Sequence, residues 1–210
     1  MRAEPPGWTL IVFARAPVEG GVKTRLIPAL GAEGAARLHR HLLARALERA
    51  CAARGARVEL WIAGDTGHPF VAECARRFGV PVFAQQGASL GERMARALAS
   101  PPAASGRTQP CVLIGTDCPA QTVGDLEQAC AALARHDLVL QPAEDGGYVL
   151  IGLKRPQPRL FDAIDWGSAR VTGQTLAGAA SLGLSVQLLR QVPDLDSAAD
   201  LARARAAGWI

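Results

Sequence analysis

The chain of 210 residues carries 49% hydrophobic and 20% charged residues, which is the composition of an ordinary soluble globular protein. Its net charge of +4 comes from 21 arginines and two lysines set against 19 acidic residues. The arginines are scattered and form no basic cluster with interleaved aromatic residues, which argues against nucleic-acid binding. No apolar run reaches the length of a membrane span, about 18 residues. We expect one domain over residues 1–210.

Cysteine and histidine patterns exclude the common zinc and disulfide frameworks. The five cysteines are an odd number without a Cys-x-x-Cys pair, so neither a disulfide network nor a structural zinc site is expected. A reducing, cytoplasmic location fits this usage. His39 and His41 are two residues apart on an expected helix and do not share a face. We expect both at the surface or at its boundary.

Apolar β-rich runs alternate along the chain with alanine-rich stretches of helical pattern. The expected strands cover residues 8–14, 57–63, 80–84, 111–116, 137–143 and 184–189. The expected helices cover residues 33–54, 68–78, 89–99, 123–135, 168–182 and 197–207. Thr122 is expected to cap the fourth helix, and Gly79 and Gly183 to end the second and fifth. This alternation predicts a mostly parallel sheet with helices on both faces.

One stretch interrupts the alternation. Residues 137–153 hold two apolar runs joined by Ala-Glu-Asp-Gly-Gly, and Asp-Gly between β-rich runs indicates a reversal of direction. Val149 and Ile151 favour a second strand directly after the turn. We therefore expect one antiparallel or strongly bent strand in an otherwise Rossmann-like order. A surface loop is expected at residues 101–110.

The loop after the first expected strand has the features of an anion-binding site, with the sequence FARAPVEGGVKTRL over residues 13–26. In open α/β sheets ligands bind beyond the carboxyl ends of the strands. The glycine pair allows backbone N–H groups to approach an oxyanion, and the cations supply charge. The order differs from the Walker A motif, because Val22 separates the second glycine from Lys23. The predicted nucleotide- and phosphate-binding residues here are Ala14, Arg15, Gly20, Gly21, Lys23 and Arg25. The alternative is a surface loop with solvated cations.

A second candidate is Asp117, in the stretch IGTDCPAQT that follows the fourth expected strand. A carboxylate at a strand end suits Mg²⁺ or Mn²⁺, usually shared with substrate phosphates. The alternative is that Asp117 caps the next helix, although Thr122 lies closer to the start of that helix. Cys118 is expected to fill space rather than act as a nucleophile, because no histidine lies nearby in sequence to activate it.

The turn AEDGGY forms a third candidate. One of its carboxylates could take a proton or orient a sugar hydroxyl, and its glycines allow a ligand to approach the backbone. The alternative, a hairpin turn in which Asp-Gly serves only the backbone, is equally open. The residues assigned here are Asp145 as a catalytic group and Glu144, Gly146, Gly147 and Tyr148 as an acceptor or sugar pocket.

Two further stretches carry open alternatives. Asp196 precedes the last expected helix, where it or Ser197 could be an ordinary N-cap, or Asp196 could be a second metal ligand. The stretch QQGASLGERM either forms a flat surface for a base or ribose or is a glycine-containing helix start. The residues assigned to nucleotide binding in the second stretch are Gln86, Gly87, Leu90 and Arg93.

Together these motifs, in this order, resemble a bacterial family of glycosyltransferase A-like proteins, long catalogued as a domain of unknown function. The family is described as nucleotide-diphospho-sugar transferase-like. Within it, the chain resembles the radical-SAM/selenodomain-associated type of transferase. The resemblance implies a three-layer α/β/α sandwich with a mixed sheet. It also implies that the cations of the first loop sit at the nucleotide phosphates and that Asp117 bears the metal. The AEDGGY turn would border the acceptor pocket.

The metal motif departs from the family pattern. Glycosyltransferase A enzymes typically carry Asp-x-Asp, whereas Thr116, Asp117 and Cys118 offer one carboxylate, an arrangement closer to small-molecule nucleotidyltransferases. The first loop, however, lacks the Gly-Gly-x-x-x-Arg signature of those enzymes.

Three functions therefore remain under consideration. The leading expectation is a metal-dependent transferase that uses a nucleotide-diphosphate sugar and an unknown small-molecule acceptor, with Lys23, Asp117 and Asp145 as catalytic groups and Mg²⁺ or Mn²⁺ held by Asp117 and Asp196. The second is nucleotidyl transfer from a nucleoside triphosphate with release of pyrophosphate. The third is an inactive nucleotide-binding module. The oligomeric state, including a homodimer, is left open.

Overall fold

The computed structural model describes residues 7–99 and 109–210, so the loop expected at 101–110 falls largely outside the described residues. Its seven strands form one sheet of order β3-β2-β1-β4-β6-β5-β7. The strands are β1 (Trp8–Arg15), β2 (Ala56–Ala63), β3 (Val82–Ala84), β4 (Cys111–Ile114), β5 (Leu138–Pro142), β6 (Tyr148–Leu153) and β7 (Val186–Leu188). The helices are α1 (Ile27–Ala52), α2 (Pro69–Phe78), α3 (Leu90–Ala99), α4 (Val123–Ala132), α5 (Val171–Ser181) and α6 (Ala198–Ala206). Within the described residues, no helix combines the length and the hydropathy needed to cross a membrane.

The predicted mixed sheet is confirmed. Strand β1 pairs in parallel with β2 and β4, and β5 pairs in parallel with β7. Strand β6 runs antiparallel to both of its neighbours, β4 and β5. The reversal occurs at the Asp-Gly turn between β5 and β6, where the sequence predicted it.

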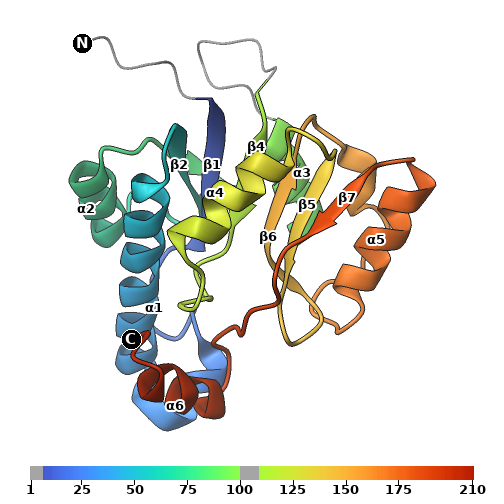
Figure 1. Cartoon of the computed structure of the whole chain (residues 1–210). Coiled ribbons are helices and arrows are strands. Elements are labelled where there is room, and N and C mark those ends of the chain that lie inside the picture. Colours follow the sequence, from blue (N-terminus) through green and yellow to red (C-terminus); the bar gives the residue numbers. More distant parts are fainter. Residues whose placement is uncertain (1–6, 100–108) are drawn as a thin grey trace.

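Helices cover both faces of the sheet, which gives the expected three layers (Figure 1). Successive strand residues point to opposite faces, and β1 shows this directly. Leu10 and Val12 pack in one core cluster with residues of α1, α2 and α4. Ile11 and Phe13 pack in a second cluster with residues of α3 and α5. Because β1 is buried on both faces, it carries the continuous apolar run that marks an interior strand.

Helix α1 begins earlier than the expected residue 33. A short 3₁₀ turn, η1 (Thr24–Leu26), leads into α1, and Pro28 lies in the first turn of α1. Proline is favoured there because a backbone N–H in the first turn has no partner within the helix, so its absence costs nothing. The helical pattern was missed because Gly31, with φ of 71°, kinks the first turns away from the rest. A second 3₁₀ turn, η2 (Pro158–Phe161), was also not expected.

The fourth strand ends at Ile114, two residues before the expected end at 116. Thr116 and Asp117 therefore leave the sheet and enter the loop before α4. Thr122 caps α4, as predicted, in a capping box with Asp125. Asp117 is thus not needed as a helix cap.

Asp125 also links α4 to the segment after β7. Its carboxylate, buried at 4% side-chain exposure, accepts hydrogen bonds from Arg190 Nε at 2.8 Å and Arg190 Nη2 at 2.6 Å. Burial raises the pKa of this carboxyl, but the hydrogen bonds from Arg190 and Thr122 outweigh it, so the net pKa lies below the usual value.

We expect Asp125→Asn to lower the free energy of unfolding by about 2–3 kcal/mol, the scale of a charged hydrogen bond left unmade in a buried place. Because the folded pKa is lowered, this contribution is complete at neutral pH and is lost as the pH falls below about 4, the usual carboxyl value. Urea unfolding at pH 7 and pH 3 checks it. Glu127→Gln, at the exposed pair with Arg54, is the control and should unfold close to wild type. Equal stability of Asp125→Asn and wild type at pH 7 would contradict the assignment.

The chain after β7 is fixed against the rest of the molecule at Leu195. Its side chain is buried with Leu26 and Leu42 and with residues of α6. Its backbone N–H donates to the carbonyl oxygen of Asp117 at 2.9 Å. This contact ties the carboxyl-terminal segment to the loop after β4 and determines where Asp196 lies.

Candidate active site

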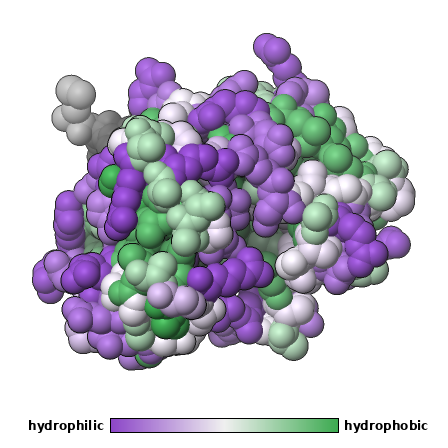
Figure 2. Space-filling model, turned by 90° about the horizontal axis from the view of Figure 1, so that it is seen from below, coloured by the Kyte–Doolittle hydropathy of each residue, from purple (hydrophilic) through white to green (hydrophobic). Residues whose placement is uncertain are grey.

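A cavity of about 770 Å³ opens at the carboxyl ends of β1 and β4, the edge at which ligands bind in open α/β sheets. These strand ends point toward the bottom of Figure 1, where α6 also lies. Seen from that end, hydrophilic residues cover much of the surface, with smaller apolar patches between them (Figure 2). A cavity of this size is large enough for a small-molecule ligand.

Most of the predicted site residues line this cavity. Those that do are Ala14, Arg15, Gly21, Lys23, Arg25, Leu90, Arg93, Asp117, Asp145, Gly147, Tyr148 and Asp196. Five others are placed outside its lining, namely Gly20, Gln86, Gly87, Glu144 and Gly146. The cavity therefore brings together predicted residues that lie as far apart in the chain as Ala14 and Asp196.

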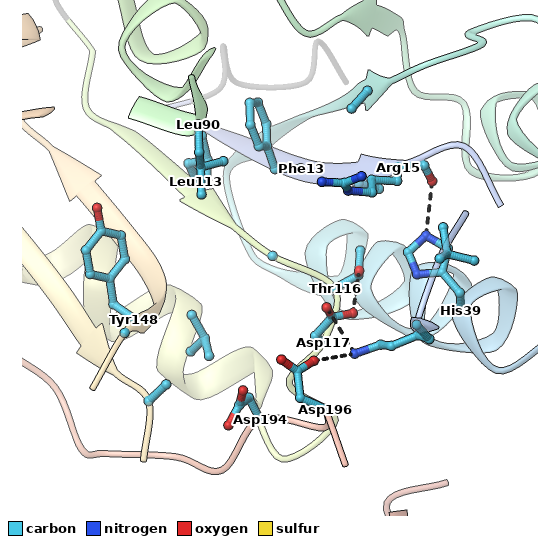
Figure 3. A pocket seen from close by; sticks show the side chains of 18 of the residues that line it. Phe13, Arg15, His39, Leu90, Leu113, Thr116, Asp117, Tyr148, Asp194 and Asp196 are labelled. Atoms are coloured by element: carbon cyan, nitrogen blue, oxygen red, sulfur yellow. Dashed lines mark hydrogen bonds and ion pairs between the residues drawn. The ribbon is translucent and has the colours of Figure 1, made fainter. Parts of the chain in front are cut away.

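An ion cluster around Lys23 forms part of the cavity lining. Its Nζ lies 3.0 Å from Asp117 Oδ2 and 3.1 Å from Asp196 Oδ1, and it also donates to the carbonyl oxygen of Leu195. The Lys23 side chain is only 4% exposed, whereas those of Asp117 and Asp196 are 45% and 42% exposed. Figure 3 shows the two carboxylates turned toward one another, with Asp194 beside them.

The backbone at Lys23 adopts a conformation that non-glycine residues avoid. Its φ of 47° and ψ of 41° lie in the left-handed region, which costs on the order of 1 kcal/mol or more outside glycine. The surrounding contacts hold it there: Val22 is buried beside it, and Lys23 O accepts from Leu26 N at 2.8 Å. Strain of this kind concentrates at functional sites.

The two carboxylates suit a divalent cation shared with substrate phosphates. Among the described residues, no group of three or more His, Cys, Asp or Glu is placed to hold a metal ion. Mg²⁺ nevertheless binds in many enzymes through one or two carboxylates, with phosphates and waters completing its octahedron. Asp117 and Asp196, whose carboxylates both lie close to Lys23 Nζ, provide that pair. The donor set therefore fits a metal–phosphate site better than an all-protein metal site.

Three arginines supply positive charge to the same cavity. The guanidinium groups of Arg15, Arg25 and Arg93 belong to its lining residues. Arg25 is 76% exposed and lies 3.5 Å from Asp196, and Arg93 donates through Nε to Gly87 O at 3.0 Å. Their remaining N–H groups match phosphate oxygens in geometry.

The AEDGGY turn divides its residues between cavity and scaffold. Asp145, Gly147 and Tyr148 line the cavity. Glu144 instead pairs with Arg203 of α6 at 2.6 Å. Gly146, with φ of 91°, packs so closely on Ala169 that a Cβ atom would lie 2.2 Å from the Ala169 carbonyl oxygen. Part of the turn therefore faces the cavity, and part of it serves contacts with neighbouring segments.

We expect Gly146→Ala to lower the free energy of unfolding by about 3 kcal/mol, because a methyl group would overlap backbone atoms and the left-handed φ disfavours alanine. Gly147→Ala, whose Cβ would have the Asp145 side chain as its nearest neighbour at 3.1 Å, should fold nearly as well as wild type. Thermal unfolding of both variants checks this. A Gly146→Ala protein as stable as the Gly147→Ala protein would show that the close packing is wrong.

Sequence reasoning missed His39, which was expected at the surface or its boundary. It is buried at 5% exposure, lines the cavity, and its Nε2 lies 3.0 Å from Arg15 O. Burial lowers the pKa of His39, although nearby Asp117 acts in the opposite direction. The missed signal is that α1 presents Ala35, His39, Leu42 and Leu43 on its buried side.

Asp194 and Gln85 are two further cavity residues that the sequence did not assign. Burial raises the pKa of Asp194 to about 6, and the neighbouring charges of Asp145 and Asp196 add to this rise. Gln85 follows β3 and donates both amide hydrogens, to Ala14 O and Trp61 O at 2.9 Å each. The glutamine that lines the cavity after β3 is therefore Gln85, one position before the predicted Gln86.

Cys118, next to Asp117, is buried at 2% exposure. Burial raises the pKa of its thiol to about 11. A thiol that stays protonated at neutral pH is a poor nucleophile. Its role as a space-filling side chain, as expected, is confirmed.

Solved structures with the same fold include one with clear sequence similarity. It is the 1.90 Å crystal structure of a Desulfovibrio desulfuricans G20 protein named "putative nucleotide-diphospho-sugar transferase", 32% identical, with a TM-score of 0.82. The match covers 93% of this chain and 84% of the other. A comparison with curated protein sequences gives no match.

More distant structures share the fold alone. CMP:2-keto-3-deoxy-manno-octonic acid synthetase in complex with CTP is 13% identical, with a TM-score of 0.59 over 96% of this chain and 98% of that one. The 4-diphosphocytidyl-2C-methyl-D-erythritol synthase of Anaerococcus prevotii DSM 20548 is 11% identical, with a TM-score of 0.63 and complete coverage of both chains. The nucleotide-diphospho-sugar transferase fold implied by the sequence motifs is thereby confirmed.

One family model matches residues 46–168, more than half of the chain. This range includes Asp117 and Asp145 but neither Lys23 nor Asp196, which the structure brings to the same cavity from outside it. The chain belongs to the family described as "Uncharacterized protein conserved in bacteria (DUF2064)".

Proposed function

We propose that this protein is a metal-dependent transferase that uses a nucleotide-diphosphate sugar as donor and a small hydroxyl-bearing molecule as acceptor. The observation that carries the proposal is the convergence of Asp117, Asp196 and the basic first loop on one cavity. The name of the Desulfovibrio relative points to the same class of donor. The narrower assignment to transferases associated with radical-SAM enzymes and selenodomains is part of the proposal, as is a cytoplasmic location, which the five free cysteines favour.

In this proposal Asp117 and Asp196 would hold Mg²⁺ or Mn²⁺, which would supply positive charge to offset the charge that develops on the leaving nucleoside diphosphate. Arg15 and Arg25 bind phosphate oxygens and add to that neutralisation. Such preorganised charge acts strongly inside a cavity from which part of the water is excluded.

The acceptor side of the cavity is assigned to the β5–β6 turn. Asp145 lines the cavity and is exposed enough to meet a hydroxyl group, so it orients or deprotonates the acceptor. Tyr148 and Leu90 both contribute apolar lining to the cavity. Glu144 is removed from this role, because its carboxylate pairs with Arg203 outside the cavity.

Nucleotidyl transfer is the second candidate, and one observation favours it. The two metal-binding carboxylates come from separate segments, the loop after β4 and the segment before α6, and not from one Asp-x-Asp motif. In this reaction a phosphate or phosphonate oxygen attacks the α-phosphate of a nucleoside triphosphate, and pyrophosphate leaves.

The products distinguish the two reactions. The protein is incubated with Mg²⁺ and panels of nucleotide sugars and nucleoside triphosphates, after a thermal-shift screen has identified the stabilising base. A free nucleoside diphosphate released from a sugar nucleotide supports glycosyl transfer, and pyrophosphate released from a triphosphate supports nucleotidyl transfer. Equal nucleotide binding with and without metal, and no turnover of either class, would leave an inactive binding module.

A further inference from the structure

We propose that Lys23 is an internal counter-cation that occupies the metal position of the free protein, and that its ammonium group leaves when nucleotide and metal bind together. The inference rests on the proposed function, because it takes a polyphosphate as the ligand that receives the released lysine. The inference concerns how metal and nucleotide enter that site.

The contacts of Lys23 hold its ammonium group against both carboxylates. Lys23 Nζ donates to Asp196 Oδ1 and to Leu195 O, and it forms an ion pair with Asp117 at 3.0 Å. Its side chain is 4% exposed. In this arrangement Lys23 neutralises the carboxylates that would bind the metal, and the predicted contact of Lys23 with a phosphate requires these contacts to be exchanged.

The charge balance of the cluster favours one cation at a time. Two carboxylates this close repel one another unless a positive charge lies between them. Arg25 contributes little, since it is 76% exposed and 3.5 Å from Asp196. A divalent ion on the same carboxylate oxygens would stand within a few Å of the ammonium group, where like charges repel strongly. Lys23 and the metal therefore compete.

A polyphosphate resolves the competition. It brings negative charge to a cavity that Arg15, Arg25 and Arg93 already line, and so offers the ammonium group new acceptors. The strained left-handed backbone of Lys23 is the point at which the loop can relax when these contacts change. Metal and nucleotide then favour the same lysine-released state, and by linkage each strengthens the binding of the other.

The test measures Mn²⁺ binding alone, by electron paramagnetic resonance, to wild type, Lys23→Met and Lys154→Met. Removing the competing charge should tighten Mn²⁺ binding by about tenfold or more, the scale on which one neighbouring charge alters carboxylate affinity for a proton. Lys154 is the other lysine of the chain, and it donates to Ala134 O away from the cavity. The Lys154→Met protein should bind Mn²⁺ as wild type does.

A second set of variants separates this effect from misfolding and from unspecific binding. Lys23→Gln should reproduce the tighter binding, and Mn²⁺ should raise the melting temperature of both neutral variants more than that of wild type. Adding Asp117→Asn to Lys23→Met should return Mn²⁺ affinity to the wild-type level or below. Neutral variants that fold but bind Mn²⁺ no better than wild type would overturn the inference, even if the protein proves to be a transferase. Tighter Mn²⁺ binding without any turnover would instead leave it standing and count against the proposed reaction.

Discussion

Asp117→Asn is expected to lower kcat/KM by at least about 10³-fold, the scale on which loss of a charge-stabilising group acts in a transition state. The side chain loses the charge that attracts a divalent cation, while its size and its hydrogen bond with Thr116 are largely kept. Metal-dependent nucleotide binding should disappear with activity. Isothermal titration with the nucleotide found in the screen, with and without Mg²⁺, measures this directly.

The control for this variant is Asp162→Asn, at an exposed aspartate outside the cavity lining. It should leave metal-dependent binding unchanged. Thermal unfolding should show that Asp117→Asn folds, because its backbone carbonyl still accepts from Leu195 N. Unchanged Mg²⁺-dependent binding in the folded Asp117→Asn protein would remove Asp117 from its proposed role.

Asp196→Asn is expected to have the second-largest effect, a fall in kcat/KM of about 10²-fold or more, since it removes the second of the two charges that would hold the cation in the proposed site. Its effect on stability should be small. The structure shows why: Ser197, and not Asp196, is the N-cap of α6, in a capping box with Asp200. The helix cap thus belongs to Ser197, which leaves the Asp196 carboxylate free of that task.

Ser197→Ala is the matched variant for this comparison. It should lower the free energy of unfolding by about 1 kcal/mol, the usual cost of losing such a cap, and keep metal-dependent nucleotide binding. Urea unfolding and titration calorimetry, applied to both proteins, give the two-way comparison. Loss of stability in Asp196→Asn with unchanged metal dependence would show that Asp196 serves the helix and not the site.

The order of elements followed from the sequence because each signal is local. Alternating β-rich and helical runs, Thr122 before α4 and the Asp-Gly turn before β6 all depend on neighbours within a few residues. The start of α1 at Ile27 was not predicted, because Gly31 interrupts the helical pattern. The short helical turn before Gly31, which contains Pro28, has no helical periodicity of its own to reveal it. Local rules treat the segments before and after Gly31 separately and do not predict that both belong to α1.

Most residues that line the cavity were predictable from the sequence, and the contacts between them were not. Strand ends located the basic loop and Asp117, because the carboxyl edge of the sheet is where ligands bind. The pairing of Lys23 with Asp196 depends on how the last segment returns to α1 through the buried Leu195. Packing between Lys23 and Asp196, which are 173 positions apart, leaves no periodic or spacing signal in either segment. The same holds for the burial of His39 against Arg15 O.

The most direct test of the metal–nucleotide site is a crystal structure with Mn²⁺ and the nucleotide identified by the thermal-shift screen, analysed by anomalous scattering from the metal. We predict one manganese peak at bonding distance from both Asp117 and Asp196, in contact with the phosphates, with the ammonium group of Lys23 moved from the carboxylates to a phosphate oxygen. A nucleotide bound outside this cavity, or a manganese ion that contacts neither carboxylate, would contradict the account.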